Sequence, residues 1–249
     1  MLYGICNLSI VPLRLEALDT SEMVSQVLYG DLFKVVEVRK SWVKIRLAFD
    51  KYEGWIDIKQ YQEITADDYK ILTSETPKLS KDLIEFVEAE NQELYSIPLG
   101  SQLNALSLLK HTFDGDISNG TQDKSQLIST AFNYLNAPYL WGGKTPFGID
   151  CSGFTQMVYK INGYKLLRDA SQQATQGDAL SFIEESEPGD LAFFDNNEGA
   201  ITHVGIIMKD NYIIHAHGKV RIDRLDHSGI YNVDKKIHTH KLRVIKKII

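Results

Sequence analysis

The stretch WGGKTPFGIDCSGF, residues 141–154, constrains the fold more than any other part of the chain, because a glycine-rich loop there leads into a helix that begins at a cysteine. After Cys151, apolar residues recur at the three- and four-residue spacing of an amphipathic helix: Phe154, Met157, Val158 and Ile161. Cys151 is therefore predicted to lie in the first helical turn, where unpaired backbone N–H groups favour a thiolate.

Two later segments carry histidines that are candidates to pair with this cysteine. HVGIIM begins at His203, and YIIHAHG contains His215. Both segments are rich in isoleucine and valine, which is typical of strands. A thiol on a helix and imidazoles on separate strands form the layout of a nucleophile and its base. The remaining histidines outside these strands are predicted to be structural: His111, His227, His238 and His240.

The composition excludes several classes of function. The 249 residues carry a net charge of −6 without a long basic tract, which disfavours nucleic acid or an anionic membrane surface as the main partner. No apolar stretch approaches the roughly 20 residues of a membrane span. The start lacks the features of a secretory signal. Of the two cysteines, Cys6 is expected to be a small buried hydrophobe. We therefore expect a cytoplasmic location, or a periplasmic one if a leader was removed.

The pattern changes twice along the chain, which predicts an α+β protein in three parts. Residues 1–64 contain short alternating strands, broken by turn residues, that suit a small β-barrel. Residues 65–120 form a predicted helical connecting segment, with helices at 81–94 and 101–113 and a surface loop, rather than a calcium loop, at 114–120. In residues 121–249 helices precede an antiparallel sheet.

Five segments occur in an order that resembles a known family. YLWGG, DCSGF, PGDLAFF, HVGI and YIIHAHG are similar to motifs of the NlpC-type cysteine peptidases of bacterial cell walls, which have a papain-like fold. The resemblance covers residues 123–249. The N-terminal part resembles a bacterial SH3-like domain, and SEMVSQVLYGD and DKYEGWI are similar to the barrel of gamma-D-glutamyl-L-diamino-acid endopeptidases. The segment between these two regions shows no such likeness.

The resemblance implies a role for each catalytic candidate. Cys151 is the nucleophile, His203 the general base that later protonates the leaving amine, and His215 the residue that orients His203. His217 is the rival for that orienting role. Zinc ligation by the cysteine and two histidines is the alternative, but no close ligand pair is present. We expect no metal and no cofactor.

The resemblance also implies a substrate, namely a free peptidoglycan stem peptide that is cut between gamma-D-Glu and the diamino acid during cell-wall recycling. Its free amino end of L-Ala requires an anionic pocket, because a buried ammonium must be paired. The residues that match this pocket are Asp150, Ser152, Tyr139, Trp141, Glu22 and Tyr52. Four of them also have an ordinary interpretation: Asp150 as a helix cap, Tyr139 and Trp141 as packing aromatics, and Glu22 as a solvated turn residue.

Two other classes of function remain open at this point. An amidase or acyltransferase on the same scaffold would keep the nucleophile but would not need the amine pocket. A non-catalytic wall-binding module is also possible for a chain with an SH3-like domain. The presence of Cys151, His203 and His215 favours the enzyme.

Overall fold

The structure is a computed structural model that describes residues 2–249, and the chain divides into two compact units. The first unit contains residues up to Thr121 together with Trp141–Thr145. The second contains Gln122–Leu140 and Pro146–Ile249. The glycine-rich loop before Cys151 is therefore divided between the two units, since Trp141–Thr145 belong to the first unit and the residues from Pro146 onward to the second.

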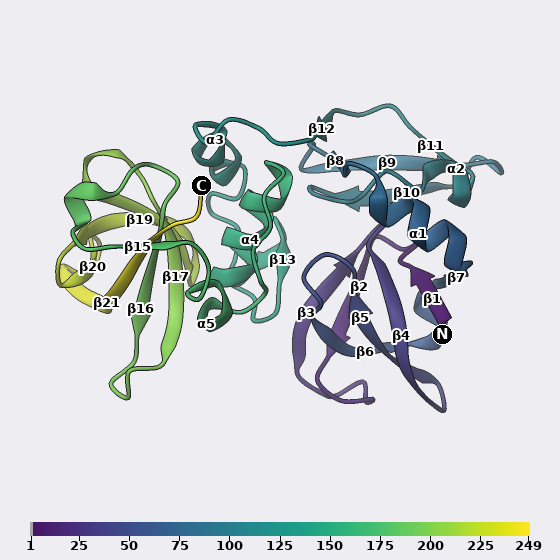
Figure 1. Cartoon of the computed structure of the whole chain (residues 1–249), viewed down its shortest axis with the longest axis horizontal. Helices are drawn as coiled ribbons and strands as arrows, with labels where there is room; N and C mark the ends of the chain where they lie inside the picture. Colours follow the sequence, from purple (N-terminus) through teal and green to yellow (C-terminus); the bar gives the residue numbers. More distant parts are fainter. Residues whose placement is uncertain (1) are drawn as a thin grey trace. The chain divides into compact units, whose positions relative to one another are not determined.

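The first unit begins with the predicted small barrel of antiparallel strands (Figure 1). Its sheet has the order β3-β2-β6-β5-β4-β1-β7. Alternate residues of each strand point into the core, as Val43, Ile45 and Leu47 do. The elements are β1 (Leu2–Ile5), β2 (Ile10–Arg14), β3 (Met23–Leu28), β4 (Leu32–Arg39), β5 (Trp42–Leu47), β6 (Glu53–Asp57), η1 (Ile58–Gln60) and β7 (Gln62–Ile64).

The segment 65–120 differs from the prediction, because it is mostly strands rather than helices. Both predicted helices are wrong: 81–94 contains the first strand of a hairpin in which Glu88 pairs with Leu94, and 101–113 contains only a short helix. The elements are α1 (Ala66–Ser74), β8 (Lys78–Ser80), β9 (Ile84–Ala89), β10 (Leu94–Pro98), α2 (Leu106–Leu109), β11 (His111–Phe113) and β12 (Ile117–Asn119). The last strand lies inside the predicted loop.

The physical reason for this error is that the run IEFVEA fits two periods. Its apolar residues lie at helical spacing, but only Val87 is fully buried, as expected for an alternating strand with one solvated face. Gln92, with a φ of 69°, then turns the chain into β10.

One hydrophobic cluster joins this segment to the barrel, so it is part of the first unit's core and not a tether. Its buried members are Ile5, Tyr29, Leu32, Tyr69, Leu72, Val87, Ile97, Leu103, Ala105 and Leu109. The contact is close at Gly30, which has a φ of 78° and where an added Cβ would lie 1.8 Å from the carbonyl oxygen of Gln102. Only glycine fits at this turn.

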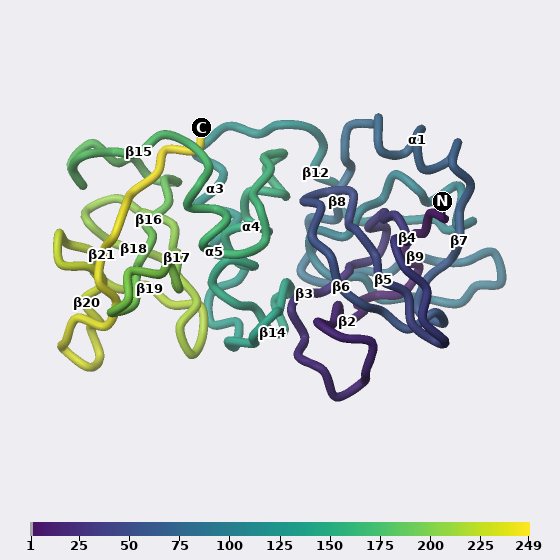
Figure 2. The backbone as a smooth tube through the Cα atoms, turned by 60° about the horizontal axis from the view of Figure 1, so that its bottom comes forward, coloured from purple at the N-terminus to yellow at the C-terminus, as the bar shows by residue number. Residues whose placement is uncertain are grey.

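The second unit packs helices on an antiparallel sheet, which confirms the predicted α+β class. Figures 1 and 2 both show α3, α4 and α5 on one side of the strands. The elements are α3 (Gln126–Phe132), α4 (Cys151–Ile161), α5 (Ala170–Gln173), β15 (Asp178–Leu180), η2 (Ile183–Glu185), β16 (Leu191–Asp195), β17 (Ile201–Ile207), η3 (Lys209–Asn211), β18 (Tyr212–His217), β19 (Lys219–Asp226), β20 (Gly229–Asn232) and β21 (Ile237–Lys247). Two short strands, β13 (Lys144–Thr145) and β14 (Gly148–Ile149), precede α4.

The sheet of the second unit has the order β15-β21-β16-β17-β18-β19-β20, and β20 also pairs with β21. The strands from β16 to β21 therefore close on themselves. Within this sheet His203 pairs with Phe194, and His215 pairs with Gly205. Paired residues of antiparallel strands share a face. The histidines thus lie on the face that carries the apolar cluster of Ile183, Ala192, Phe194, Ile207, Ile213, Leu225, Ile230 and Ile245.

Within residues 2–249, none of the helices has both the length and the apolar character needed to span a bilayer.

Candidate active site

Cys151 is the first residue of α4, as the sequence predicts. The carboxylate of Asp150 caps this helix by accepting a hydrogen bond from the backbone N–H of Gly153 at 2.6 Å. Such a cap stabilises a helix by about 1 kcal/mol. It also fixes where the helix begins, so the thiol is placed among the unpaired N–H groups of the first turn.

A buried ion pair lies directly beneath this helix start. Arg168 is 1% exposed, and its guanidinium binds both carboxylate oxygens of Asp150 at 3.0 and 2.7 Å. The same guanidinium donates to the hydroxyl of Ser152 at 3.0 Å. Asp150 therefore caps the helix and also pairs with Arg168. The predicted binding of a substrate amine by Asp150 and Ser152 stays a prediction.

The sulfur of Cys151 lies beside the strand that carries His203. It is 4.0 Å from the carbonyl oxygen of Thr202, and α4 packs against β17 and β18. A hydrogen bond from the backbone of Val204 also reaches the sulfur. Two of the backbone groups that contact the thiol therefore belong to the residues on either side of His203, and a third belongs to Ser152 in the helix itself.

The two predicted catalytic histidines are in direct contact. Nε2 of His203 lies 2.8 Å from Nδ1 of His215, and the two rings are nearly perpendicular at 84°. The ring of His217 is 6.4 Å from that of His203, so the geometry favours His215 as the orienting partner. His240, predicted to be structural, stacks on His203 with the ring centroids 4.2 Å apart.

The sequence reasoning missed a carboxylate behind His215. Oδ2 of Asp223 lies 3.1 Å from Nε2 of His215, and both side chains are fully buried. Arg221 donates to both oxygens of Asp223, at 2.7 and 2.9 Å. The available signal was the alternation in VRIDRL, which places Asp223 on the same strand face as the buried Leu225.

The protonation state of the thiol differs from the prediction. Burial, followed by the negative charge of Asp150, raises the pKa of Cys151 to about 12, and this outweighs the opposing effects of Arg168 and nearby backbone N–H groups. The free protein therefore holds a neutral thiol at pH 7. The helix terminus alone does not ionise a sulfur that is 7% exposed.

The histidines are neutral as well. Burial, and then the neighbouring His215, His240 and His217, keep the pKa of His203 well below 6.5. A neutral imidazole can accept a proton, so His203 can remove the thiol proton during attack.

The aromatic and acidic residues of the predicted pocket fall in different units. Tyr139 belongs to the second unit, and burial followed by the charges of Cys151 and Asp150 raises its pKa to about 12. Trp141 belongs to the first unit, where its indole N–H donates to Glu22 at 2.6 Å. Tyr52, also in the first unit, packs against the barrel core. The predicted contribution of these residues to substrate binding stays a prediction.

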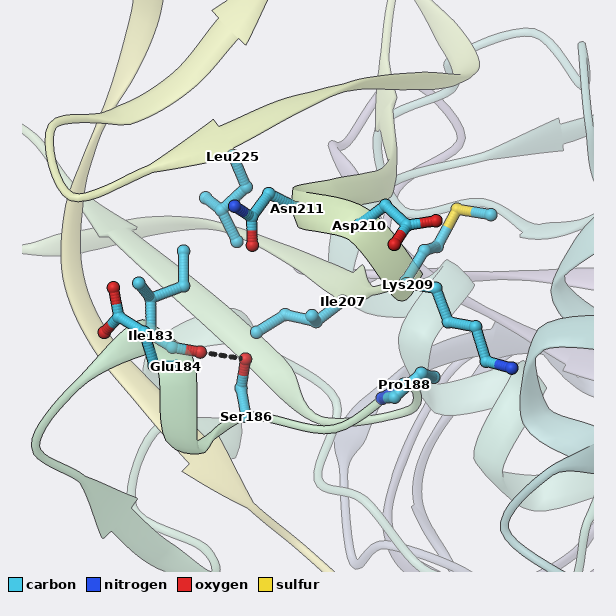
Figure 3. Close-up of a pocket in the computed structure, with 10 residues that line it drawn as sticks. Ile183, Glu184, Ser186, Pro188, Ile207, Lys209, Asp210, Asn211 and Leu225 are labelled. Carbon is cyan, nitrogen blue, oxygen red and sulfur yellow. Dashed lines mark hydrogen bonds between the residues drawn. The ribbon is translucent and has the colours of Figure 1, made fainter.

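A pocket of about 260 Å³ in the second unit is lined by other residues (Figure 3). Its lining includes Ile207, Leu225 and Asp210, and the Ser186 hydroxyl there donates to the carbonyl of Ile183 at 2.6 Å. It contains none of the predicted site residues, and no cysteine or histidine that could act as nucleophile or base. Within the described residues, no cluster of three or more histidine, cysteine or acidic side chains is suited to hold a metal ion.

Comparison with known proteins supports the predicted family of both the peptidase region and the barrel region. Residues 136–239 match the NlpC/P60 family, and residues 13–60 match the bacterial dipeptidyl-peptidase Sh3 domain. A gamma-D-glutamyl-L-lysine dipeptidyl-peptidase of Bacillus subtilis (strain 168) is 31% identical over 82% of this chain and 75% of its own length. Dipeptidyl-peptidase 6 of Lysinibacillus sphaericus is 26% identical over 83% of this chain and 85% of its own length.

A solved structure shows the same fold. An NlpC/P60 family protein from Bacillus cereus ATCC 10987 superposes with a TM-score of 0.79, covers 99% of both chains and is 21% identical. The likeness extends through the segment 65–120, which the sequence left without a known counterpart.

Proposed function

Since the chain belongs to the NlpC/P60 family of cysteine peptidases that act on peptidoglycan, we propose that it hydrolyses the bond between gamma-D-Glu and the L-diamino acid of stem peptides that begin with a free L-Ala. The observation that carries this proposal is the match to gamma-D-glutamyl-L-lysine dipeptidyl-peptidases over four fifths of the chain, which includes the barrel region as well as the peptidase region. We place the reaction in the cytoplasm, where released stem peptides are recycled; cell fractionation tests this location.

The chemistry begins with Cys151 and His203. As the sulfur attacks the carbonyl carbon, its proton passes to His203, so that the neutral thiol and neutral imidazole of the free protein are the correct starting states. The oxyanion forms beside the first turn of α4, whose unpaired N–H groups stabilise it. His203 then protonates the leaving amine of the diamino acid.

The acyl-enzyme is resolved by water. The neutral His203 removes a proton from the water molecule, and the thiol is regenerated when the tetrahedral intermediate collapses. The product is the dipeptide L-Ala-gamma-D-Glu. Release of a dipeptide requires that the site bind the amino end of the substrate at a fixed distance from the cleaved bond.

The amino end is the feature that distinguishes this proposal from an amidase or acyltransferase. A charged hydrogen bond to an ammonium contributes about 1.5–3 kcal/mol, which corresponds to roughly 10- to 150-fold in rate or affinity. N-acetylation of L-Ala removes this interaction.

The test is hydrolysis of L-Ala-gamma-D-Glu-L-Lys, followed by mass spectrometry of the products, beside the meso-diaminopimelate peptide and the N-acetylated L-Lys peptide. We expect release of L-Ala-gamma-D-Glu from both free peptides, and at least tenfold slower cleavage of the acetylated one. Equal rates on the free and acetylated peptides would count against the amine pocket. Cleavage at another bond would overturn the proposed specificity.

A further inference from the structure

Behind His215, the carboxylate of Asp223 is surrounded by hydrogen-bond donors. Its Oδ2 accepts from His215 Nε2 at 3.1 Å and from Arg221 Nε at 2.7 Å. Its Oδ1 accepts from Arg221 Nη2 at 2.9 Å and from the backbone N–H of Val233 at 3.0 Å. Each oxygen therefore accepts two hydrogen bonds, and neither can carry a proton without losing one of them.

We propose that Asp223 is a positioning residue that fixes the tautomers of His215 and His203 in turn, and thereby assigns Nδ1 of His203 as the nitrogen that takes the thiol proton. The inference rests on the proposed pairing of Cys151 with His203 and deepens it. No described contact joins Asp223 to the sulfur of Cys151 or to the predicted substrate-binding residues, so it acts through His215.

The first step of the argument is the charge of Asp223. Burial by itself raises the pKa of this carboxyl group, but the hydrogen bonds from His215, Arg221 and Val233 outweigh burial and hold the pKa far below its usual range. Asp223 is therefore an anion and only an acceptor. The atom that faces it, Nε2 of His215, must be the N–H of that ring.

The second step follows from the neutrality of His215. Burial lowers the pKa of His215, and the opposing effect of Asp223 does not reverse this. A neutral ring with its proton on Nε2 has a lone pair on Nδ1. That lone pair faces Nε2 of His203 at 2.8 Å, so His203 must donate there. His203 is neutral too, which leaves its Nδ1 as the free acceptor.

The charges around this relay come from every strand packed against it. His217 lies on the strand of His215, and His240 on β21 stacks on His203. Arg221 is held in turn by Asp234 at 2.8 Å. Asp223 favours the charged form of His215, whereas burial, His217 and Arg221 oppose it, and burial is the largest of these effects. The two histidines therefore stay neutral near pH 7.

The chain offers a matched control on the same strand. Asp226 also accepts a hydrogen bond from a histidine, since its Oδ2 lies 2.8 Å from Nε2 of His238. Both of those side chains are about half exposed, at 51% and 44%, and no described contact joins them to the proposed active site. Asp226→Asn therefore makes the same chemical change in a pair outside the relay.

The direct experiment is NMR of the imidazole nitrogens in the ¹⁵N-labelled wild-type protein at pH 7, which needs no substrate and no variant. We expect His215 and His203 both to carry the proton on Nε2. A proton on Nδ1 of His203 would overturn the proposal. Because the tautomers are read without turnover, they can support the relay even if the stem-peptide substrate proves wrong.

The kinetic experiment compares Asp223→Asn with Asp226→Asn on L-Ala-gamma-D-Glu-L-Lys. An amide turns one acceptor of Asp223 into a donor among four donors, and His215 relieves this by moving its proton to Nδ1. We expect kcat to fall by about 10²- to 10⁴-fold with KM unchanged, because a wrongly protonated base is comparably damaging in serine peptidases. Asp226→Asn should stay within twofold.

Three further results decide the matter. An Asp223→Asn protein that keeps kcat within threefold, or in which only KM changes, would overturn the proposal. If that variant does not fold, Arg221→Lys is the second variant, because it removes the guanidinium fork but leaves the carboxylate; we then expect wild-type tautomers and a kcat reduced by about tenfold or less. A shift of His215 to the Nδ1 tautomer in Asp223→Asn, seen in the same NMR experiment, would support the relay.

Discussion

Both units bury a cysteine, but in surroundings of opposite kinds. Cys6 follows β1 and belongs to an apolar cluster with Val11, Leu13 and other barrel residues, and its thiol donates to the carbonyl of Leu8 at 3.2 Å. Cys151 lies at a helix start above the buried ion pair of Asp150 and Arg168. In both places burial raises the thiol pKa to about 12.

The thiol pKa of the free protein therefore does not distinguish the predicted nucleophile from the structural cysteine. What separates the two cysteines is their neighbours. The described contacts place His203 on the strand beside Cys151, whereas those of Cys6 are backbone carbonyls and apolar side chains. An apolar cluster holds a side chain by packing alone. The polar network under Cys151 instead fixes the start of α4, and with it the direction of the thiol.

The largest difference should appear between the alanine variants of the two cysteines. We expect Cys151→Ala to lower hydrolysis of the stem peptide by at least about 10⁴-fold, because the covalent route is lost. Cys6→Ala should keep kcat within about twofold and reduce stability by roughly 1 kcal/mol through the small cavity. Peptide turnover and thermal unfolding measure both. Turnover retained in Cys151→Ala would end the proposed mechanism.

The second prediction concerns the ion pair that supports Cys151. Arg168→Met removes the guanidinium that pairs with the buried carboxylate of Asp150, so we expect the free energy of unfolding to fall by about 3–5 kcal/mol. The control is Arg39→Met, which removes a pair with Glu37 whose side chains are 61% and 46% exposed, and should change stability by less than about 1 kcal/mol. Denaturant unfolding measures both variants. Equal changes in the free energy of unfolding would show that the network under α4 contributes no more to stability than an exposed ion pair.

A smaller effect is expected from the first unit, which we predict to act in binding and not in chemistry. Glu22→Gln should raise KM for the free peptide by about tenfold with kcat unchanged, because a charged partner for the ammonium is lost. Glu16→Gln, in the same β2–β3 loop, is the control and should change neither constant. Tyr52→Phe should likewise leave kcat unaltered. An unchanged KM in Glu22→Gln would remove this residue from the binding site.

The smallest effect is a pH dependence of stability that arises in the second unit. Burial, and then His215 and His217, lower the pKa of His240 to about 4. The unfolded chain therefore binds a proton at higher pH than the folded one. The stability that this neutral histidine contributes is present above about pH 6.5 and is lost as the pH falls towards 4. His240→Phe should flatten this slope by on the order of 1 kcal/mol between pH 7 and pH 5.

The three tryptophans provide the readout for that comparison. Trp42, Trp55 and Trp141 all belong to the first unit, so tryptophan fluorescence follows this unit alone, while far-UV circular dichroism follows both. We expect the pH-dependent loss of stability to be larger by circular dichroism than by fluorescence. The same slope in wild type and His240→Phe would contradict the assignment.

Much of the second unit was predictable because its signals are local. The helix after Cys151, the strands of His203 and His215 and the α+β class all follow from periodicity and from turn residues next to one another in the chain. The prediction for 81–94 was wrong because its apolar spacing fits both a helix and a strand. The strand forms because it allows Val87 and Ile97 to pack against the barrel.

The family, the helix that begins at Cys151 and the strands of His203 and His215 could be read from the chain alone, because they depend on motifs and on neighbours within a few residues. The groups that surround the predicted catalytic residues became visible only in the folded structure: the guanidinium of Arg168 beside Asp150, the ring of His240 stacked on His203 and the carboxylate of Asp223 bonded to His215. The physical reason is that burial and hydrogen bonding set the protonation of each group, and both arise from residues that are distant in sequence and meet only when the sheet closes.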